Sequence, residues 1–242
     1  MMIRSLRISV GILLVLGMPV AASASWFGAD FTADVVHQMA AQQQQGKMYV
    51  GHGKVRTEMH GTRGMMVEII DPTNSSILLL DPQQMRYQQV PIPLQVNMDR
   101  SQRGNPCAML PQASCQQNGS EVVNGRKAVR WQIAMDDQQA TQWIDDEHRF
   151  AVRMAVNGDV QMEMRYQAGE QLNDRKVERW TTHYFTPQGE VVATQWYDPQ
   201  LNVAIRQQMP DGSQRELRNI RLGTPAASLF ELPANYRLMT PQ

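Results

Sequence analysis

Lysine and cysteine are scarce in this chain, and charge of either sign is not in excess. Lysine occurs only at Lys47, Lys54, Lys127 and Lys176, and the 23 basic residues balance 23 acidic ones. A nucleic-acid-binding domain carries a basic patch, and none is visible here. Beyond the N-terminal segment, no run approaches the roughly 20 apolar residues that span a bilayer. We therefore predict neither a nucleic-acid partner nor a membrane span.

The N-terminal segment has the three parts of a cleavable secretory signal peptide. Arg4 and Arg7 supply a positive start, residues 8–20 form an apolar run, and residues 22–24 read Ala-Ser-Ala, a small-x-small cleavage pattern. We expect residues 1–24 to be removed after Ala24 and residues 25–242 to work as one domain in the periplasm or as a secreted protein. Cleavage leaves 21 basic and 23 acidic residues, and no cysteine at the cut could carry a lipid.

Cys107 and Cys115 are the two cysteines of the chain. An even number of cysteines in an exported protein favours a disulfide. A redox pair would instead need Cys-x-x-Cys at the start of a helix. We therefore predict a structural disulfide that closes a short loop and stabilises the fold by about 2–3 kcal/mol.

Two stretches alternate apolar and polar residues, as a strand with one buried face does. The first covers residues 129–136 and the second residues 160–168, where Gln161, Glu163, Arg165 and Gln167 form the polar face. Weaker alternation predicts four further strands, at residues 54–59, 149–156, 202–207 and 215–222.

Turn-forming dipeptides separate the apolar runs at intervals of about ten residues. They predict an antiparallel meander, because Asn-Gly and Asp-Gly accept positive φ angles and Asp-Pro initiates turns. Residues 91–117 interrupt this regular spacing of turns and include a predicted short helix at 94–102. A single helical turn is expected at 226–232. The sum is a mainly β fold with one strongly curved sheet of about ten strands. The six dipeptides begin at Asp71, Asp81, Asn124, Asn157, Asp198 and Asp211.

The sequence contains none of the catalytic motifs or metal-ligand spacings that we compared with it. The chain has no Gly-x-Ser-x-Gly motif and no phosphate-binding glycine loop. Its five histidines do not have the close spacings that build zinc sites. The acidic triplet at residues 145–147 could bind a cation, but a solvated turn before Phe150 fits it better, and residues 136–137 are interpreted in the same way. We expect no enzyme, no cofactor and no metal site.

Methionine is abundant, with 14 residues left after cleavage. They include Met65-Met66 and Met162-x-Met164. Thioether sulfur binds Cu(I), and exported copper proteins use Met-x-Met and Met-x-x-Met clusters. Methionine also fills apolar surfaces. Because Met162 and Met164 alternate with Glu163, an apolar sheet face fits them better, and copper handling stays an alternative.

Short strand and turn segments along most of the chain resemble those of exported proteins in the outer-membrane lipoprotein-sorting (LolA/LolB-like) superfamily. The chain is most similar to a branch of single-domain members. The resemblance implies a half-barrel in which an antiparallel sheet curls around an apolar cavity under short covering helices. Members of the superfamily carry lipoprotein acyl chains across the periplasm, and others sense envelope stress. The lack of an N-terminal lipid-bearing cysteine argues against a membrane-anchored acceptor. The similar segments lie at residues 31–35, 46–50, 54–59, 69–71, 80–82, 87, 121–126, 131, 143–145 and 229–236.

A curled sheet with one apolar face must cover that face with a core, a helix or a ligand. We therefore expect non-catalytic binding or carriage of a hydrophobic ligand, such as a lipid acyl chain or a lipidated protein. A second hypothesis is an envelope sensor or scaffold that binds a protein partner through an exposed aromatic patch at Trp180, Trp196 and Tyr197. The residues predicted to contact the hydrophobic ligand are Val129, Trp131, Ile133, Met135, Val160, Met162, Met164 and Tyr166.

Overall fold

The computed structural model describes residues 27–39, 42–61, 64–91, 104–110, 112–135 and 137–239, which form sixteen strands and two short 3-10 helices. The predicted signal peptide, the predicted helix at 94–102 and Asp136 lie outside these residues. In chain order the elements are β1 (Phe31–Met39), β2 (Gln42–Gly51), β3 (Lys54–Gly61), β4 (Gly64–Asp71), β5 (Ser76–Asp81), β6 (Arg86–Pro91), η2 (Pro106–Met109), β7 (Ser114–Val123), β8 (Arg126–Met135), β9 (Gln138–Asp145), β10 (Ala151–Val156), β11 (Asp159–Leu172), β12 (Arg175–Thr186), β13 (Gly189–Asp198), β14 (Val203–Gln208), β15 (Gln214–Leu222), η3 (Ala227–Phe230) and β16 (Arg237–Leu238).

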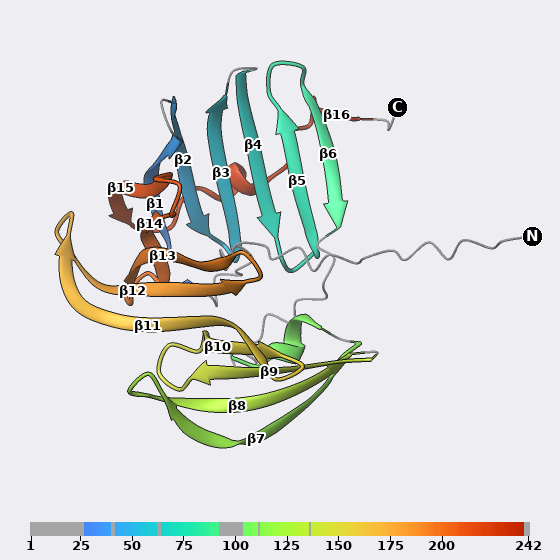
Figure 1. Ribbon diagram of the computed structural model, residues 1–242. Coiled ribbons are helices and arrows are strands. Elements are labelled where there is room, and N and C mark those ends of the chain that lie inside the picture. The colour runs from blue at the N-terminus through green and yellow to red at the C-terminus, as the bar shows by residue number, and fades with distance from the viewer. Residues whose placement is uncertain are drawn as a thin grey trace, which may run out of the picture.

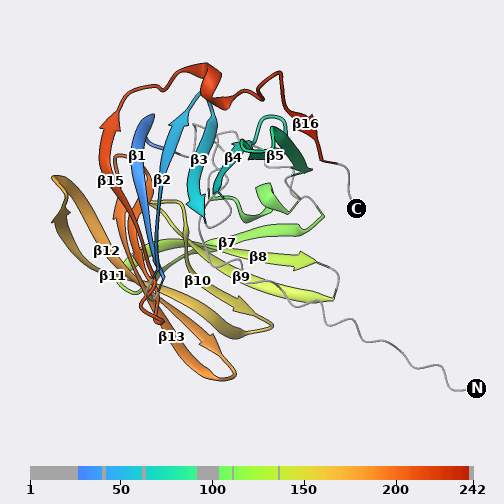
Figure 2. The same ribbon diagram turned by 90° about the horizontal axis from the view of Figure 1, so that it is seen from above.

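The sheet consists of two antiparallel meanders that meet at one seam. Strands β1–β6 follow one another on one side of the seam, strands β15 back to β7 follow one another on the other side, and β1 pairs with β15. The short β16 adds a parallel pair to β6. The sheet curves strongly and does not close, because β16 and β7 are its two edges (Figures 1 and 2).

This curved, open, mainly β sheet is the half-barrel that the sequence predicts, but two details differ. The sheet has sixteen strands, not about ten. The covering helices are nearly absent, since the described residues form only η2 and η3. The predicted helical turn near the C-terminus is present as η3, whose Phe230 packs on β4 and β5.

All six predicted turn dipeptides lie at strand ends. Asn124 and Gly125 have φ angles of 50° and 80°, the positive values that a tight hairpin turn requires. At the β13–β14 turn the carboxylate of Asp198 accepts the backbone N–H groups of Gln200 at 2.9 Å and Leu201 at 3.0 Å. The aspartate thus holds the turn that the following proline initiates.

Three buried apolar clusters stabilise the sheet. The central cluster lies at the seam, where Phe31, Val50, Ile205 and Leu217 from β1, β2, β14 and β15 are fully buried. A second cluster surrounds Trp180, and a third lies between β4, β5 and the C-terminal segment. Burial of each large apolar side chain contributes about 1.5–3 kcal/mol.

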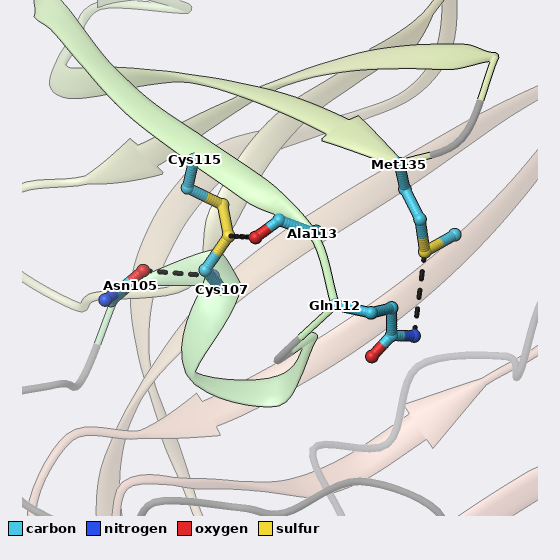
Figure 3. Close-up of a disulfide and its surroundings, with 6 residues drawn as sticks. All are labelled: Asn105, Cys107, Gln112, Ala113, Cys115 and Met135. Atoms are coloured by element: carbon cyan, nitrogen blue, oxygen red, sulfur yellow. Dashed lines mark hydrogen bonds between the residues drawn. A yellow bond between two sulfur atoms is a disulfide. The ribbon is translucent and has the colours of Figure 1, made fainter.

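The predicted disulfide between Cys107 and Cys115 is formed, with 5.9 Å between the Cα atoms (Figure 3). It joins η2 to the start of β7. The side chain of Asn105 caps η2 by accepting the backbone N–H of Cys107 at 3.0 Å. The disulfide therefore fixes the loop before β7 against an edge strand of the sheet.

Candidate ligand-binding cavity

A cavity of about 530 Å³ lies against β1 and β10–β15. Strand register places its wall on one face of the sheet, since Met164 pairs with Thr182 and Thr182 pairs with Ala193. The volume falls within the roughly 300–1,000 Å³ of small-molecule sites. The lining residues are His37, Phe150, Ala151, Met162, Met164, Thr182, Tyr184, Ala193, Thr194, Gln195, Tyr197, Ala204, Gln207, Met209, Ser213, Gln214 and Arg215.

The wall of the cavity has an apolar part and a polar part. Residues from β11 and the approach to β10, among them Phe150, Met162 and Met164, form the apolar part. The polar part includes Gln207 and Arg215 from β14 and β15, and β12 and β13 add Thr182 and Gln195. No aspartate or glutamate is among the lining residues, and Arg215 is their one strong base.

Arg215 is held at this wall by strand pairing on both sides. It pairs with His37 of β1 and with Gln207 of β14. Its guanidinium Nη2 lies 4.0 Å from the Sδ atom of Met48, a buried residue of the central cluster. Burial lowers the pKa of Arg215 to about 10, so the side chain remains charged at neutral pH. Burial, and then the charge of Arg215, lower the pKa of His37, which favours a neutral imidazole beside the arginine.

The opposite face of these strands carries ion pairs instead of an apolar wall. Glu216 accepts hydrogen bonds from Arg206 and Arg218, each at 2.7 Å. Glu163 likewise lies 2.7 Å from Arg153 in a salt bridge. The sequence predicts Glu163 on a polar strand face, and the structure shows this carboxylate to be buried beneath its arginine partners, not solvated.

A buried polar network supports one end of the cavity. His148 contacts Asp145 through Nδ1 at 2.9 Å and Glu178 through Nε2 at 3.0 Å. Its ring lies 5.3 Å from Phe150 and 5.4 Å from Tyr197, centroid to centroid, and both of these aromatic residues line the cavity. The network therefore positions two aromatic side chains of the wall.

Asp145 is the centre of this network. Its Oδ2 accepts a hydrogen bond from Arg126 Nε at 2.5 Å, and its Oδ1 accepts the backbone N–H of His148 at 2.7 Å. Burial raises the pKa of Asp145, but the hydrogen bonds from His148 and Arg126 outweigh it and hold this pKa well below its usual value. Burial lowers the pKa of His148, yet the bond to Asp145 and the charge of Glu178 raise it overall.

The acidic triplet is therefore only partly the solvated turn that the sequence predicts. The side chain of Glu147 is exposed and that of Asp146 is partly exposed, whereas Asp145 is 1% exposed and ion-paired. The difference arises because Asp145 ends β9 facing Arg126 across the β8–β9 pair. The described residues contain no group of three or more His, Cys, Asp or Glu side chains that could hold a metal ion.

Of the eight residues predicted to contact a hydrophobic ligand, Met162 and Met164 line the cavity. The other six lie elsewhere on the sheet: Tyr166 is 42% exposed, Val160 lies near the start of β11, and four residues lie on β8. The lining residues that the prediction lacks come from β1, the start of β10, β12–β15 and the β14–β15 turn. The four on β8 are Val129, Trp131, Ile133 and Met135.

The exposed aromatic patch predicted at Trp180, Trp196 and Tyr197 is absent. Trp180 is fully buried, Tyr197 is 7% exposed, and Trp196 is partly buried, with its indole N–H donating to Glu170 at 2.9 Å. Among the described residues, no helix is long and apolar enough to cross a membrane.

Comparison with protein-family models found no match, and comparison with curated proteins found none. Solved structures align with most of this chain, at low identity and with TM-scores below 0.5. A domain from Vibrio parahaemolyticus described as an outer membrane lipoprotein-sorting protein domain aligns over 84% of this chain and 89% of that chain, with 11% identity and a TM-score of 0.37. A DUF1329 family protein from Desulfovibrio piger aligns over 85% and 90%, with 10% identity and a TM-score of 0.38.

MucB of Pseudomonas aeruginosa, solved in a complex with MucA, also aligns, over 84% of this chain and 96% of that chain, with 11% identity and a TM-score of 0.23.

Proposed function

We propose that this protein is a non-catalytic binding protein that holds the acyl chain of a lipid or a lipidated protein in the cavity lined by β1 and β10–β15. The cavity carries the proposal. An acyl chain needs an apolar wall that replaces water, at about 25 cal/mol per Å² of buried apolar surface, and Phe150, Met162, Met164 and Ala204 provide one. The signal-peptide pattern and the disulfide support a periplasmic site of action.

A pair of neighbouring substitutions on β13 tests this proposal. Ala193 lines the cavity, and Ala193→Trp would place an indole in the space that the chain occupies. Val192 is the preceding residue, points to the other face and is 38% exposed. Val192→Trp therefore adds the same side chain to the same strand outside the cavity.

The probe is N-phenylnaphthylamine, a neutral apolar dye that becomes fluorescent on leaving water. We expect the wild-type protein and the Val192→Trp variant to bind it. The Ala193→Trp variant should lose binding while its unfolding free energy, measured in urea, stays within about 1 kcal/mol of wild type. Equal binding by the two variants would place the ligand elsewhere. No binding by the wild-type protein would overturn the proposal.

A second candidate function is protein binding by addition of a strand to β7. In the part of the chain that the structure describes, β7 pairs only with β8, and its Val122 is 71% exposed. An unpaired strand edge can accept a strand from another chain. Val122→Pro, which disrupts that edge, would abolish partner capture in a crosslinking experiment and leave dye binding unchanged.

A further inference from the structure

We propose that the ligand is a single-chain amphiphile with a carboxylate headgroup, and that the guanidinium of Arg215 binds this headgroup. The inference rests on the proposed function and adds the chemical class of the ligand. Arg215 is the positively charged group of a wall that contains no carboxylate. The other lining residues of the cavity leave this charge uncompensated.

The charge of Arg215 has no counter-ion among the described residues, because no carboxylate oxygen of theirs lies within 4.0 Å of it. Among the described residues, its one side-chain hydrogen-bond partner is the thioether of Met48, at 4.0 Å. The neighbouring Glu216 lies on the opposite face of β15 and forms salt bridges with Arg206 and Arg218. A partly buried charge without a partner destabilises a fold, and a bound anion removes that penalty.

The groups around Arg215 suit a carboxylate. A guanidinium presents a planar pair of N–H donors that matches the two oxygens of a carboxylate. Gln207, paired directly with Arg215, adds an amide donor from β14. His37, on the other side, adds an imidazole N–H without a second full charge, since its pKa is lowered by burial and by Arg215. One fixed cation with neutral donors favours a monoanion over a dianionic phosphate.

The division of the wall gives the ligand its direction. The headgroup end lies at β1, β14 and β15, and the apolar end lies at Phe150, Met162 and Met164. A volume of about 530 Å³ is in the lower half of the range for small-molecule sites, which suits one chain better than several. The charge and the shape of the cavity therefore both indicate a fatty-acid-like ligand.

The test compares laurate with dodecanol as competitors that displace N-phenylnaphthylamine at pH 7.5. The two competitors share a chain and differ in the charge of the headgroup. We expect wild type to prefer laurate by about tenfold or more, because hydrogen bonds to charged groups are worth at least that ratio. Arg215→Gln should abolish the preference and keep dodecanol binding, and Arg215→Lys should restore part of it. Arg221→Gln, on an exposed arginine of the same strand, should keep the full preference.

The outcomes separate the inference from the proposed function. Dye and dodecanol binding without a preference for laurate in wild type would overturn the role of Arg215 and leave the acyl-chain proposal standing. Absence of binding by the dye and by both competitors would overturn both. The urea midpoint adds an independent check: Arg215→Gln removes an uncompensated charge and should not lower it. A lowered midpoint together with loss of dye binding would show that Arg215 is structural and would overturn the inference.

Discussion

Replacing Asp145 with asparagine tests whether the buried network beneath the cavity stabilises the fold. Asp145 is 1% exposed and pairs with Arg126 at 2.5 Å and with His148 at 2.9 Å. Asparagine keeps the shape of the side chain but removes its charge. The guanidinium of Arg126 then keeps only the exposed Glu147 as a charged partner, at 2.8 Å. Breaking a buried pair by removing one partner costs about 3–5 kcal/mol, and the partial exposure of Arg126 places Asp145→Asn near 3 kcal/mol.

The assay is urea unfolding of the mature protein at pH 7. About 3 kcal/mol appears as a lower midpoint with an unchanged slope, and as a decrease of about 6–12 °C in Tm for a domain of this size. Asp146→Asn is the matched control, because its carboxylate is partly exposed and lies 3.3 Å from the exposed Lys127. Exposed pairs contribute about 0–1 kcal/mol, so this control should remain close to wild type.

The pH dependence of the same difference gives a second test. The folded-state pKa of Asp145 is held below its usual value of 3.8, so its contribution is complete above pH 3.8 and decreases as pH falls through the folded pKa. The difference in unfolding free energy between wild type and Asp145→Asn should therefore be constant near neutral pH and shrink in acid. Equal effects of Asp145→Asn and Asp146→Asn at pH 7 would refute the structural role of the network.

Three further predictions concern stability. Replacing both Cys107 and Cys115 with serine removes a link across a sequence separation of 8 and should lower the unfolding free energy by about 2.6 kcal/mol; an unchanged urea midpoint would contradict this. His148 has a raised pKa, so its contribution is complete below pH 6.5 and is lost as pH rises through the folded pKa. The difference in urea unfolding midpoint between wild type and His148→Gln should therefore decrease at alkaline pH. An increase would contradict the stabilising role of protonated His148. Phe230→Ala empties a site that is 3% exposed and should cost about 3–5 kcal/mol in urea unfolding, whereas a loss below 1 kcal/mol would mean that η3 does not stabilise β4 and β5.

The fold class follows from local signals in the sequence, and the strand count does not. Turn dipeptides are local, so every one of the six marks a real strand end. Strands are missed where their residues are polar on both faces. The Gln-rich residues 42–45 belong to β2, and β7 consists largely of exposed polar residues, so neither has the alternation that identifies a half-buried strand.

The cavity could be predicted only in part, because its two walls depend on different kinds of contact. Met162 and Met164 were found from the alternation within β11. His37 and Arg215 meet only because β1 pairs with β15, which lie at opposite ends of the domain. One local signal could have identified Arg215. It lies two residues before the buried Leu217 and therefore on the same, inward face of the strand, where a basic residue is unusual. A register shift in the β1–β15 pair obscures that phase farther along the strand.

The central claim is that the cavity holds one acyl chain. Native mass spectrometry of the mature protein, purified from periplasm without detergent, tests it most directly. The account predicts one bound amphiphile per protein in wild type and in Val192→Trp, and none in Ala193→Trp. A protein that shows only its own mass in all three samples, even after incubation with laurate, would contradict it.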